Sequence, residues 1–303
     1  MSEQPERPDT TPMTPLDAPE ALQLGIVPLR PLALPDLVAG MAQGLRRNAA
    51  ALIGVGFAVI TATELLRWFV STLVFGDVPD ARAITDRPRL DWAEVRPLLA
   101  DAALHAVIAA LLGLLLVAVV NVVVPRAVFG HTTGARAALG AALPALPRLL
   151  LLALLTAVVF GAIAAVAVFA VFAGGSAGLL LALPAVAAMF YLVIAFTFAQ
   201  SIVVVEGGNP VAALERSRRL VAAVGWWRVL GILLLAGVVF GLLGMIVSAV
   251  FGRISGGGAL AEALAAVLSG TLISPATLVL QSLLYVDHRS RVEGIEGLWR
   301  KAG

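Results

Sequence analysis

The sequence predicts an all-α integral membrane protein, a bundle of six transmembrane helices, and three observations support this fold class. Hydrophobic residues make up 60% of the 303 residues and charged residues 13%, whereas soluble domains carry about 25% charged residues. Six long apolar runs follow residue 48, and runs of about 20 residues are needed to cross a hydrocarbon layer. Because backbone polar groups in lipid must be paired internally, we expect these runs to be helices.

The N-terminal 32 residues differ in composition from everything that follows. They are polar, acidic and rich in Pro and Thr, without apolar periodicity, which predicts a disordered tail over 1–32. The tail also lacks the basic region, short apolar core and small-residue cleavage site of a secretory signal. We therefore expect a six-span membrane domain over 33–286 and a cytoplasmic C-terminal tail over 287–303.

The apolar runs also give the boundaries of the spans and the turns between them. The third and fourth runs are separated only by GGSAG (174–178), which predicts a tight hairpin turn, and GRISGGG (252–258) joins the last two. Pro184 and Pro275 fall within spans and predict kinks that free backbone carbonyls. We place the six spans at about 49–75, 98–124, 146–173, 177–205, 226–250 and 260–286.

The distribution of basic residues predicts the orientation, because basic loops resist translocation. Most of the basic residues lie in connections on one side of the membrane. The connections on the opposite side are a charge-balanced first loop (77–96) and, later, the turn that contains Arg253. We therefore expect both termini to be cytoplasmic, in the inner membrane of a prokaryotic cell. The basic residues on the expected cytoplasmic side are Arg46, Arg47, Arg126, Arg136, Arg148, Arg216, Arg218, Arg219, Arg228, Arg289, Arg291, Arg300 and Lys301.

Three connections on the basic side predict amphipathic surface helices, at 34–48, 134–148 and 209–228. In the third, Asn209 is expected to cap the helix and Pro210 suits its first turn. Such helices lie in the headgroup region, and Trp226 and Trp227 are expected to anchor the next span at the interface. Its predicted apolar face is Leu214, Leu220, Val221 and Val224, and its polar side carries Glu215, Arg216, Arg218 and Arg219.

A repeat connects these elements. RLLLLALLTAVVFG (148–161) and RVLGILLLAGVVFG (228–241) align without a gap, and each follows a surface helix. The pattern predicts three parallel units, each a surface helix followed by a transmembrane hairpin. Parallel repeats occur in transporters, although duplication of any stable hairpin gives the same pattern.

Four ionisable residues fall inside the first two spans, where such residues are costly: Glu64, Arg67, Asp101 and His105. Their i,i+3 and i,i+4 spacings place each pair on one helix face, and similar depths predict that the pairs meet across the hairpin. One hypothesis is a polar pocket that responds to protons or ions. The other, which we favour because the other hairpins lack counterparts, is a structural ion-pair network.

A second polar set lies at the predicted cytoplasmic ends of the spans. Glu206 directly precedes the turn into the third surface helix, so it is either a switchable latch to an arginine or, as we favour, an ordinary interface ion pair. The set comprises Asn121, Gln200, Glu206, Gln281 and Asp287, near Arg126 and Arg228. The candidate interface and lipid contacts are Glu206, Arg216, Arg218, Arg219, Arg228 and Asp287.

No enzyme motif is present in the sequence. GxSxG, HExxH and GxxxxGK[ST] are absent, and cysteine does not occur. His105, His131 and His288 are too scattered to predict a metal site, and no cofactor is expected. Arginines beside a bilayer predict contact with anionic lipid headgroups rather than with nucleic acid.

Three segments resemble a prokaryotic membrane family. They are IVPLRPLALPDLVAGMAQGLRRNAAALIG (26–54), VVVEGGNPVAALERSRRLVAAVGWWRVLGILLL (203–235) and LLYVDHRSRVEG (283–294). In these three segments the chain is similar to the family named for the membrane domain of glycerophosphoryl diester phosphodiesterase, and to related multi-span proteins. In the fused enzymes a separate soluble barrel carries out catalysis, and we expect no such barrel here. The resemblance therefore implies a fold and a membrane location, and no reaction.

We expect a non-catalytic membrane protein that acts as an envelope or lipid-associated accessory factor. The alternative is a small transporter or permease that uses the polar pocket between the first two spans. An intramembrane enzyme acting on lipids ranks last, since no convergent catalytic set is evident.

Overall fold

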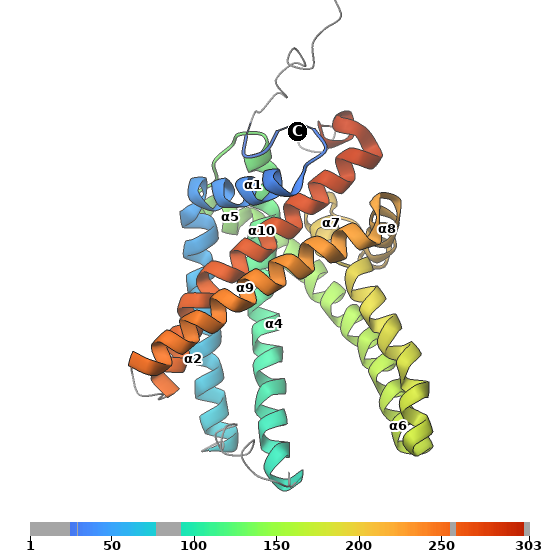
Figure 1. The fold of residues 1–303 in the computed structure, drawn as a ribbon. Helices are drawn as coiled ribbons and strands as arrows, with labels where there is room; N and C mark the ends of the chain where they lie inside the picture. The colour runs from blue at the N-terminus through green and yellow to red at the C-terminus, as the bar shows by residue number, and fades with distance from the viewer. Residues whose placement is uncertain (1–24, 29, 77–91, 255–258, 300–303) are drawn as a thin grey trace, which may run out of the picture.

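A computed structural model describes residues 25–28, 30–76, 92–254 and 259–299, and these form a helical bundle (Figure 1). No strand occurs in this part of the chain. The predicted all-α membrane bundle is confirmed, since six segments are long and apolar enough to cross a membrane: Ala50–Val74, Val95–Val128, Ala135–Gly174, Ala177–Glu206, Trp226–Ile254 and Leu260–Gly294. Residues 1–24 of the expected tail, most of the first loop and residues 255–258 lie outside the described residues.

The helices follow one another as three units, each a short helix and then two long arms. The first unit is α1 (Leu34–Arg47), the short π-helix η1 (Ala50–Gly54) with α2 (Val55–Phe75), and α4 (Trp92–Val128). The second is α5 (Ala135–Ala142) with η2 (Leu143–Ala145), α6 (Leu146–Ala195) and α7 (Ala199–Glu206). The third is α8 (Pro210–Val224), α9 (Trp226–Ile254) and α10 (Ala259–Trp299). This order matches the predicted threefold pattern of surface helix and hairpin.

α6 contains both arms of the second hairpin. A Cβ atom added at Gly178 would lie 2.1 Å from the carbonyl oxygen of Ala170, whereas positions eight residues apart in a straight helix are separated by about 12 Å. The chain therefore doubles back near 174–178, as the GGSAG stretch predicts. Only glycine allows the two arms to approach this closely.

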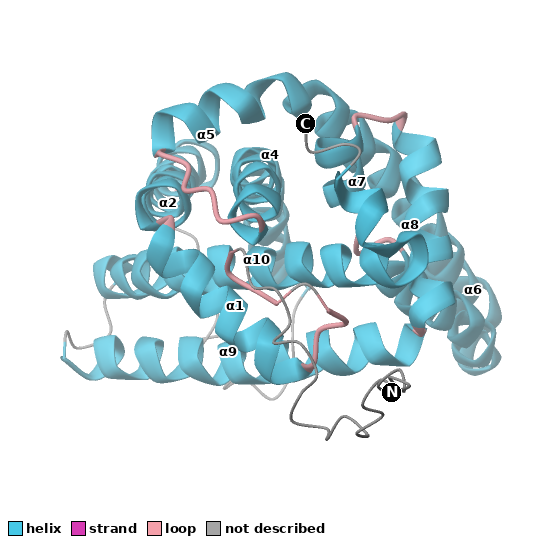
Figure 2. Ribbon diagram, turned by 90° about the horizontal axis from the view of Figure 1, so that it is seen from above, coloured by secondary structure: helices cyan, strands magenta, loops and turns pink. Residues whose placement is uncertain are grey.

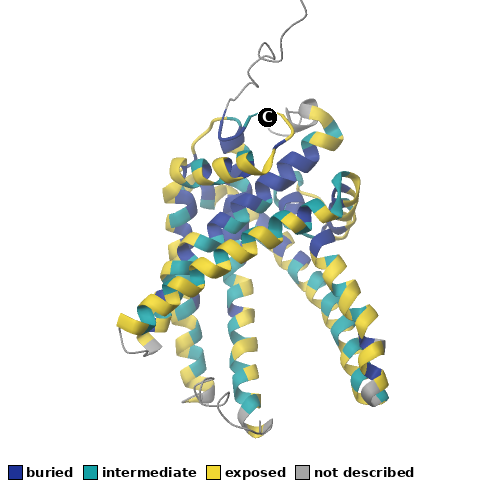
Figure 3. Cartoon of the chain, viewed as in Figure 1, coloured by how far each residue is buried: buried dark blue, intermediate teal, exposed yellow. Residues whose placement is uncertain are grey.

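The three hairpins diverge from one end of the molecule. The arms of α6 lean away from α2 and α4, while α9 and α10 lie side by side and run obliquely across the bundle (Figures 1 and 2). α1, α5 and α8 cover the end where the hairpins converge, which we call the capped end. Buried residues gather there, and the diverging arms are largely exposed (Figure 3). Large buried side chains of this core include Leu37, Leu52, Leu149, Phe198 and Leu283.

The ordered core begins earlier than the sequence analysis expected. Ile26 and Val27 are 2% exposed, although the predicted tail extended to residue 32. Ile26 and Val27 pack against α1, where the positions that face them are the buried glycines Gly40 and Gly44. A Cβ at Gly40 would lie 2.3 Å from a Val27 methyl group, so a larger residue there would clash. The sequence analysis missed this short apolar stretch because the residues around it are polar and Pro-rich, and because it becomes ordered only through tertiary contacts.

The C-terminal region also differs from the expectation of a tail over 287–303. α10 continues to Trp299, with a kink at Gly294 (φ 71°), and Asp287, His288 and Arg289 are at most 3% exposed. The helix persists past the apolar run because its charged residues have buried partners. Apolar composition indicates where a membrane span ends, but it does not indicate where the helix that contains the span ends.

Pro275 lies inside α10, at a close crossing with α2. Proline has no N–H, so the Thr271 carbonyl one turn earlier loses its helical partner. Gly56 of α2 faces this point, where an added Cβ would lie 2.8 Å from Pro275 Cγ and 3.6 Å from the Thr271 oxygen. A small residue opposite a proline thus lets the two backbones approach closely.

Candidate functional site

The four intramembrane ionisable residues meet across the first hairpin, as predicted. Arg67 of α2 lies 3.6 Å from Glu64 on the same helix and 3.5 Å from Asp101 of α4. His105 Nε2 of α4 lies 3.7 Å from Glu64 Oε1. We call these four residues the hairpin cluster. Helical spacing and the antiparallel arrangement of α2 and α4 together place them side by side.

The contacts of the hairpin cluster are long. All three exceed about 3.2 Å, the usual upper limit of a good N–H···O hydrogen bond, and the Arg67 and His105 side chains are 37% exposed. Arg67 Nε and Asp101 Oδ1 are buried and have no hydrogen-bond partner among the described residues. The cluster is therefore a loose group of charges rather than a closed network.

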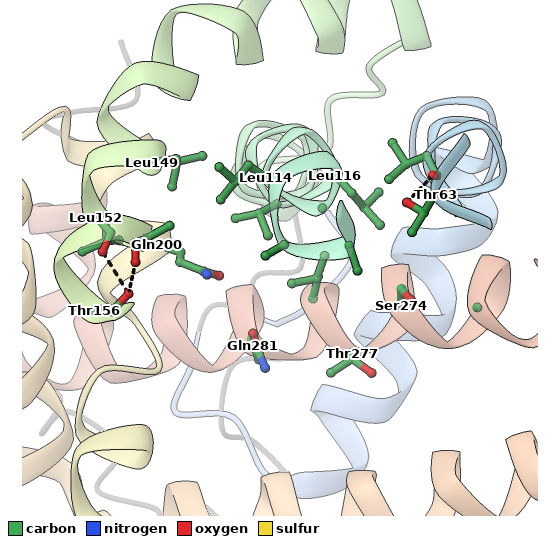
Figure 4. A pocket seen from close by; sticks show the side chains of 18 of the residues that line it. Thr63, Leu114, Leu116, Leu149, Leu152, Thr156, Gln200, Ser274, Thr277 and Gln281 are labelled. Carbon is green, nitrogen blue, oxygen red and sulfur yellow. Dashed lines mark hydrogen bonds between the residues drawn. The ribbon is translucent and has the colours of Figure 1, made fainter. Parts of the chain in front are cut away.

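A cavity of about 950 Å³ adjoins the cluster, and Glu64 and His105 form part of its lining. It lies between the first hairpin, the arms of α6, α7 and α10, and most of its wall is aliphatic (Figure 4). The uncharged polar residues on the wall are Thr63, Thr156, Thr197, Gln200, Ser274, Thr277 and Gln281. Sequence reasoning placed Gln200 and Gln281 in one polar set but did not predict the cavity, because divergence of the hairpins creates it.

The predicted surface helix at 209–228 is α8 (Pro210–Val224), and its cap and buried face are as expected. The Asn209 side chain accepts a hydrogen bond from the Val211 N–H at 3.0 Å, which satisfies one of the unpaired donors of the first turn. Leu214, Leu220 and Val221 are buried against α6, α7 and α10. α8 is thus fixed to the spans through its apolar face.

Ser217 adds a polar contact that the sequence analysis missed. It is fully buried on α8, donates to the Ala195 carbonyl at 2.7 Å and accepts from the Phe198 N–H at 3.1 Å. These two backbone groups belong to the break between α6 and α7, where helical pairing is interrupted. A serine on the buried face of an amphipathic helix is the only sequence signal for this role.

A buried carboxylate organises one side of the capped end. Asp287 has a fully buried side chain and accepts hydrogen bonds from the Leu32 N–H at 2.7 Å and from Arg291 at 3.0 Å. Arg228 lies 3.0 Å from the same carboxylate and donates to the Leu32 carbonyl at 2.8 Å. We call these groups the Asp287 centre. It joins α10, the start of α9 and the segment before α1, which are the three segments that carry the family resemblance.

Glu206 forms a second centre beside the first, and its arginine partner is Arg216. The Arg216 Nε donates to Glu206 at 2.9 Å, and the Tyr285 hydroxyl donates to the same carboxylate at 2.8 Å. Arg216 also bonds Glu293, which in turn accepts from Arg289 at 2.8 Å. We call these five residues the Glu206 centre.

Arg216 is held in its charged form by this arrangement. Partial burial lowers the pKa of its guanidinium, but the hydrogen bonds and charges of Glu293 and Glu206 outweigh burial and raise the pKa above its ordinary value. The structure therefore places Arg216 in an ion-pair network and away from free contact with lipid. Arg218 and Arg219, the neighbouring candidates, are exposed.

Exposed arginines surround the same end of the bundle. Arg219 has only a 3.9 Å contact with Glu215. Six others are exposed and make no ion pair with any acidic residue in the described part of the chain: Arg46, Arg47, Arg126, Arg136, Arg148 and Arg218. They come from α1, α4, α5, α6 and α8, so every unit contributes to this basic surface.

No group of three or more potential metal ligands occurs among the described residues. Comparison of the chain with protein-family models, curated proteins and solved structures finds no match. The resemblance of its three segments to the membrane-domain family therefore stays a prediction.

Proposed function

We propose that the protein is a non-catalytic, lipid-associated accessory factor of the membrane, which binds anionic lipid headgroups through the basic surface of its capped end. The supporting observation is the set of six exposed arginines without acidic partners in the described part of the chain, distributed over all three repeat units. A basic residue near an anionic membrane surface contributes about 1 kcal/mol of attraction. Several such residues on one rigid face make headgroup binding strong enough to affect stability.

The rigid attachment of the surface helices supports this proposal. α8 is fixed through Leu214, Ser217 and Leu220, so Arg218 remains exposed without having to hold the helix in place. Arg216 differs, because Glu206 and Glu293 already pair with it. Lipid contacts and fold contacts are thus carried by separate residues, and they can be tested separately.

The test compares thermal stability in nanodiscs of neutral and of anionic lipid. Wild-type protein is expected to be more stable in anionic lipid. Arg136→Gln with Arg218→Gln is expected to reduce that difference by about one third, because two of the six arginines are replaced and each contributes a similar attraction. The double variant Arg96→Gln with Arg253→Gln, at exposed positions of the other ends of α4 and α9, is the matched control and retains the full difference. Because salt screens surface charges over about 8 Å, high salt reduces the effect.

Equal stability of the wild type in neutral and anionic lipid would contradict the proposal. Leu220→Asp distinguishes a fold defect from a lipid defect. It forces a carboxylate into the buried face of α8 and is expected to lower stability in both lipids alike.

A small transporter or permease is the second candidate, favoured by one observation. Glu64 and His105 of the hairpin cluster line the cavity, and intramembrane ionisable residues beside cavities mark transport pathways. Reconstitution in proteoliposomes with a pH gradient tests this candidate. Gradient-driven uptake that is lost in Glu64→Gln supports transport, and absence of uptake over a screen of small solutes leaves the accessory role.

A further inference from the structure

The cavity between the hairpins has the size of a ligand site. Its volume is about 950 Å³, at the upper end of the 300–1,000 Å³ that small-molecule sites occupy. The wall is formed mainly by aliphatic side chains, such as Leu114, Leu149 and Leu152 (Figure 4). An occupant must therefore present a largely apolar surface.

The charges on the wall limit what the polar part of an occupant can be. Neither arginine nor lysine lines the cavity, and its charged groups are Glu64 and His105. These two lie 3.7 Å from each other, and Glu64 also lies 3.6 Å from Arg67. An anionic head would find no arginine or lysine on the wall, and His105 already lies beside the Glu64 carboxylate. The charge of such a head would stay uncompensated, which is costly in a buried site. The site therefore suits an uncharged head.

Hydrogen bonds on the wall show which groups can hold that head. Each of four lining threonines already donates to a carbonyl of its own helix. The donors and acceptors are Thr63 to Val59 at 2.8 Å, Thr156 to Leu152 at 2.9 Å, Thr197 to Val193 at 3.1 Å and Thr277 to Ile273 at 2.8 Å.

Gln200 of α7 and Gln281 of α10 behave differently. Neither side chain hydrogen-bonds to any described residue, and both line the cavity (Figure 4). A carboxamide offers two donor hydrogens and one acceptor oxygen. In an apolar setting such groups favour a partner that brings its own hydrogen-bonding oxygens.

We propose that this cavity binds a neutral, glyceride-type amphiphile. Its acyl chain lies along the aliphatic wall, and its ester and hydroxyl oxygens accept hydrogen bonds from Gln200 and Gln281. This site is separate from the basic surface at the capped end, which takes anionic headgroups. Failure of either proposal therefore leaves the other intact.

Three ligands that share one acyl chain test the choice of head. Monoolein, oleate and oleylamine are titrated into detergent-solubilised protein, and the shift of the melting temperature gives an apparent Kd. Saturable stabilisation by monoolein is expected, with binding at least tenfold weaker for oleate and oleylamine. Equal effects of all three ligands would show nonspecific partitioning into an apolar groove and overturn the proposal.

A glycine pair provides the steric test. Gly113 lines the cavity, and a Cβ added there meets no atom within 4 Å, so Gly113→Phe is expected to fill the space without straining the backbone and to abolish monoolein binding. Gly161 of α6 is exposed, does not line the cavity and is equally unobstructed. Gly161→Phe should therefore bind monoolein as the wild type does. Binding that survives Gly113→Phe would place the ligand elsewhere.

A glutamine pair tests the contact with the head. Gln200→Leu with Gln281→Leu is expected to weaken monoolein binding about tenfold, which corresponds to the loss of two ordinary hydrogen bonds. Gln43→Leu, on α1 outside the cavity, is the control and leaves the affinity unchanged. An unchanged affinity in the double variant would remove the glutamines from the site and overturn the proposed head contact.

Discussion

The hairpin cluster and the Asp287 centre both gather carboxylates and arginines within a membrane protein, yet they differ in closure. In the hairpin cluster the ion pairs are 3.5–3.7 Å long, and Arg67 is 37% exposed. In the Asp287 centre the contacts are 2.7–3.1 Å, and the carboxylate is fully buried. Because breaking a buried ion pair leaves an uncompensated charge, we expect loss of the Asp287 centre to destabilise the fold more than loss of the long contacts of the hairpin cluster.

The two sites also differ in what they connect. The hairpin cluster joins α2 and α4, the two arms of the first hairpin, and its contacts arise from helical spacing and the pairing of these arms. The Asp287 centre joins segments separated by 255 residues, through the Leu32 N–H, and by 196 residues, through Arg228 and the Leu32 carbonyl. Loss of the Asp287 centre should therefore loosen the whole capped end, while loss of the hairpin cluster should affect one hairpin.

Among substitutions of a single arginine or serine, the largest effect is expected from Arg228→Met. Methionine keeps much of the apolar stem of arginine but loses the bonds to Asp287 and to the Leu32 carbonyl. Hydrogen bonds that involve a charged group contribute about 1.5–3 kcal/mol, so we expect the free energy of unfolding in detergent to fall by about 3 kcal/mol.

Arg253→Met, near the opposite end of the same helix, is the matched control. Arg253 is exposed and makes no ion pair within the described part of the chain, so the change should be at most about 0.5 kcal/mol. Similar losses in the two variants would show that the capped end has no special role.

A smaller loss is expected from Ser217→Ala, which alters the capped end without touching a charge. The substitution leaves the Ala195 carbonyl and the Phe198 N–H without their partner at the break between α6 and α7. An unsatisfied buried group costs about 1–3 kcal/mol, and chemical denaturation would measure the loss.

Ser269→Ala is the comparison, because that hydroxyl donates only to carbonyls of its own helix. Such bonds contribute little to stability, so this variant should unfold like the wild type. If Ser217→Ala did the same, the serine would have no part in holding the break.

The smallest effect is expected from Arg67→Gln in the hairpin cluster. Its ion pairs are longer than good hydrogen bonds, and polar contacts between transmembrane helices contribute about 1 kcal/mol or less on average. The same denaturation assay should give a change within that limit. A loss comparable to that of Arg228→Met would mean that the cluster is a structural lock after all.

Sequence reasoning found the elements whose signals are local. Apolar runs gave six spans, Asn209 and Pro210 gave the start of α8, and helical spacing with similar depths brought Glu64, Arg67, Asp101 and His105 together. Each of these follows from a periodicity or a cap that a few neighbouring residues define.

What sequence reasoning missed depends on the assembled fold. Asp287 was recognised as a polar interface residue near Arg228, but one of its partners is the Leu32 backbone N–H. A backbone partner cannot be predicted from residue types. Glu206 was expected to pair with an arginine, and only the packing of α8 selects Arg216. The i,i+4 pairs Asp287–Arg291 and Arg289–Glu293 were the one available hint that the expected tail was a buried helix.

The most direct test of this account makes one substitution, Asp→Asn, at both sites and compares the free energies of unfolding. Asp287→Asn should cost about 3–5 kcal/mol, because it leaves two arginines with a neutral partner in a buried site. Asp101→Asn should cost about 1 kcal/mol or less, because its single 3.5 Å contact is longer than a good hydrogen bond and the change removes a charge that is costly within a span. A loss in Asp101→Asn equal to or greater than that in Asp287→Asn would contradict the account.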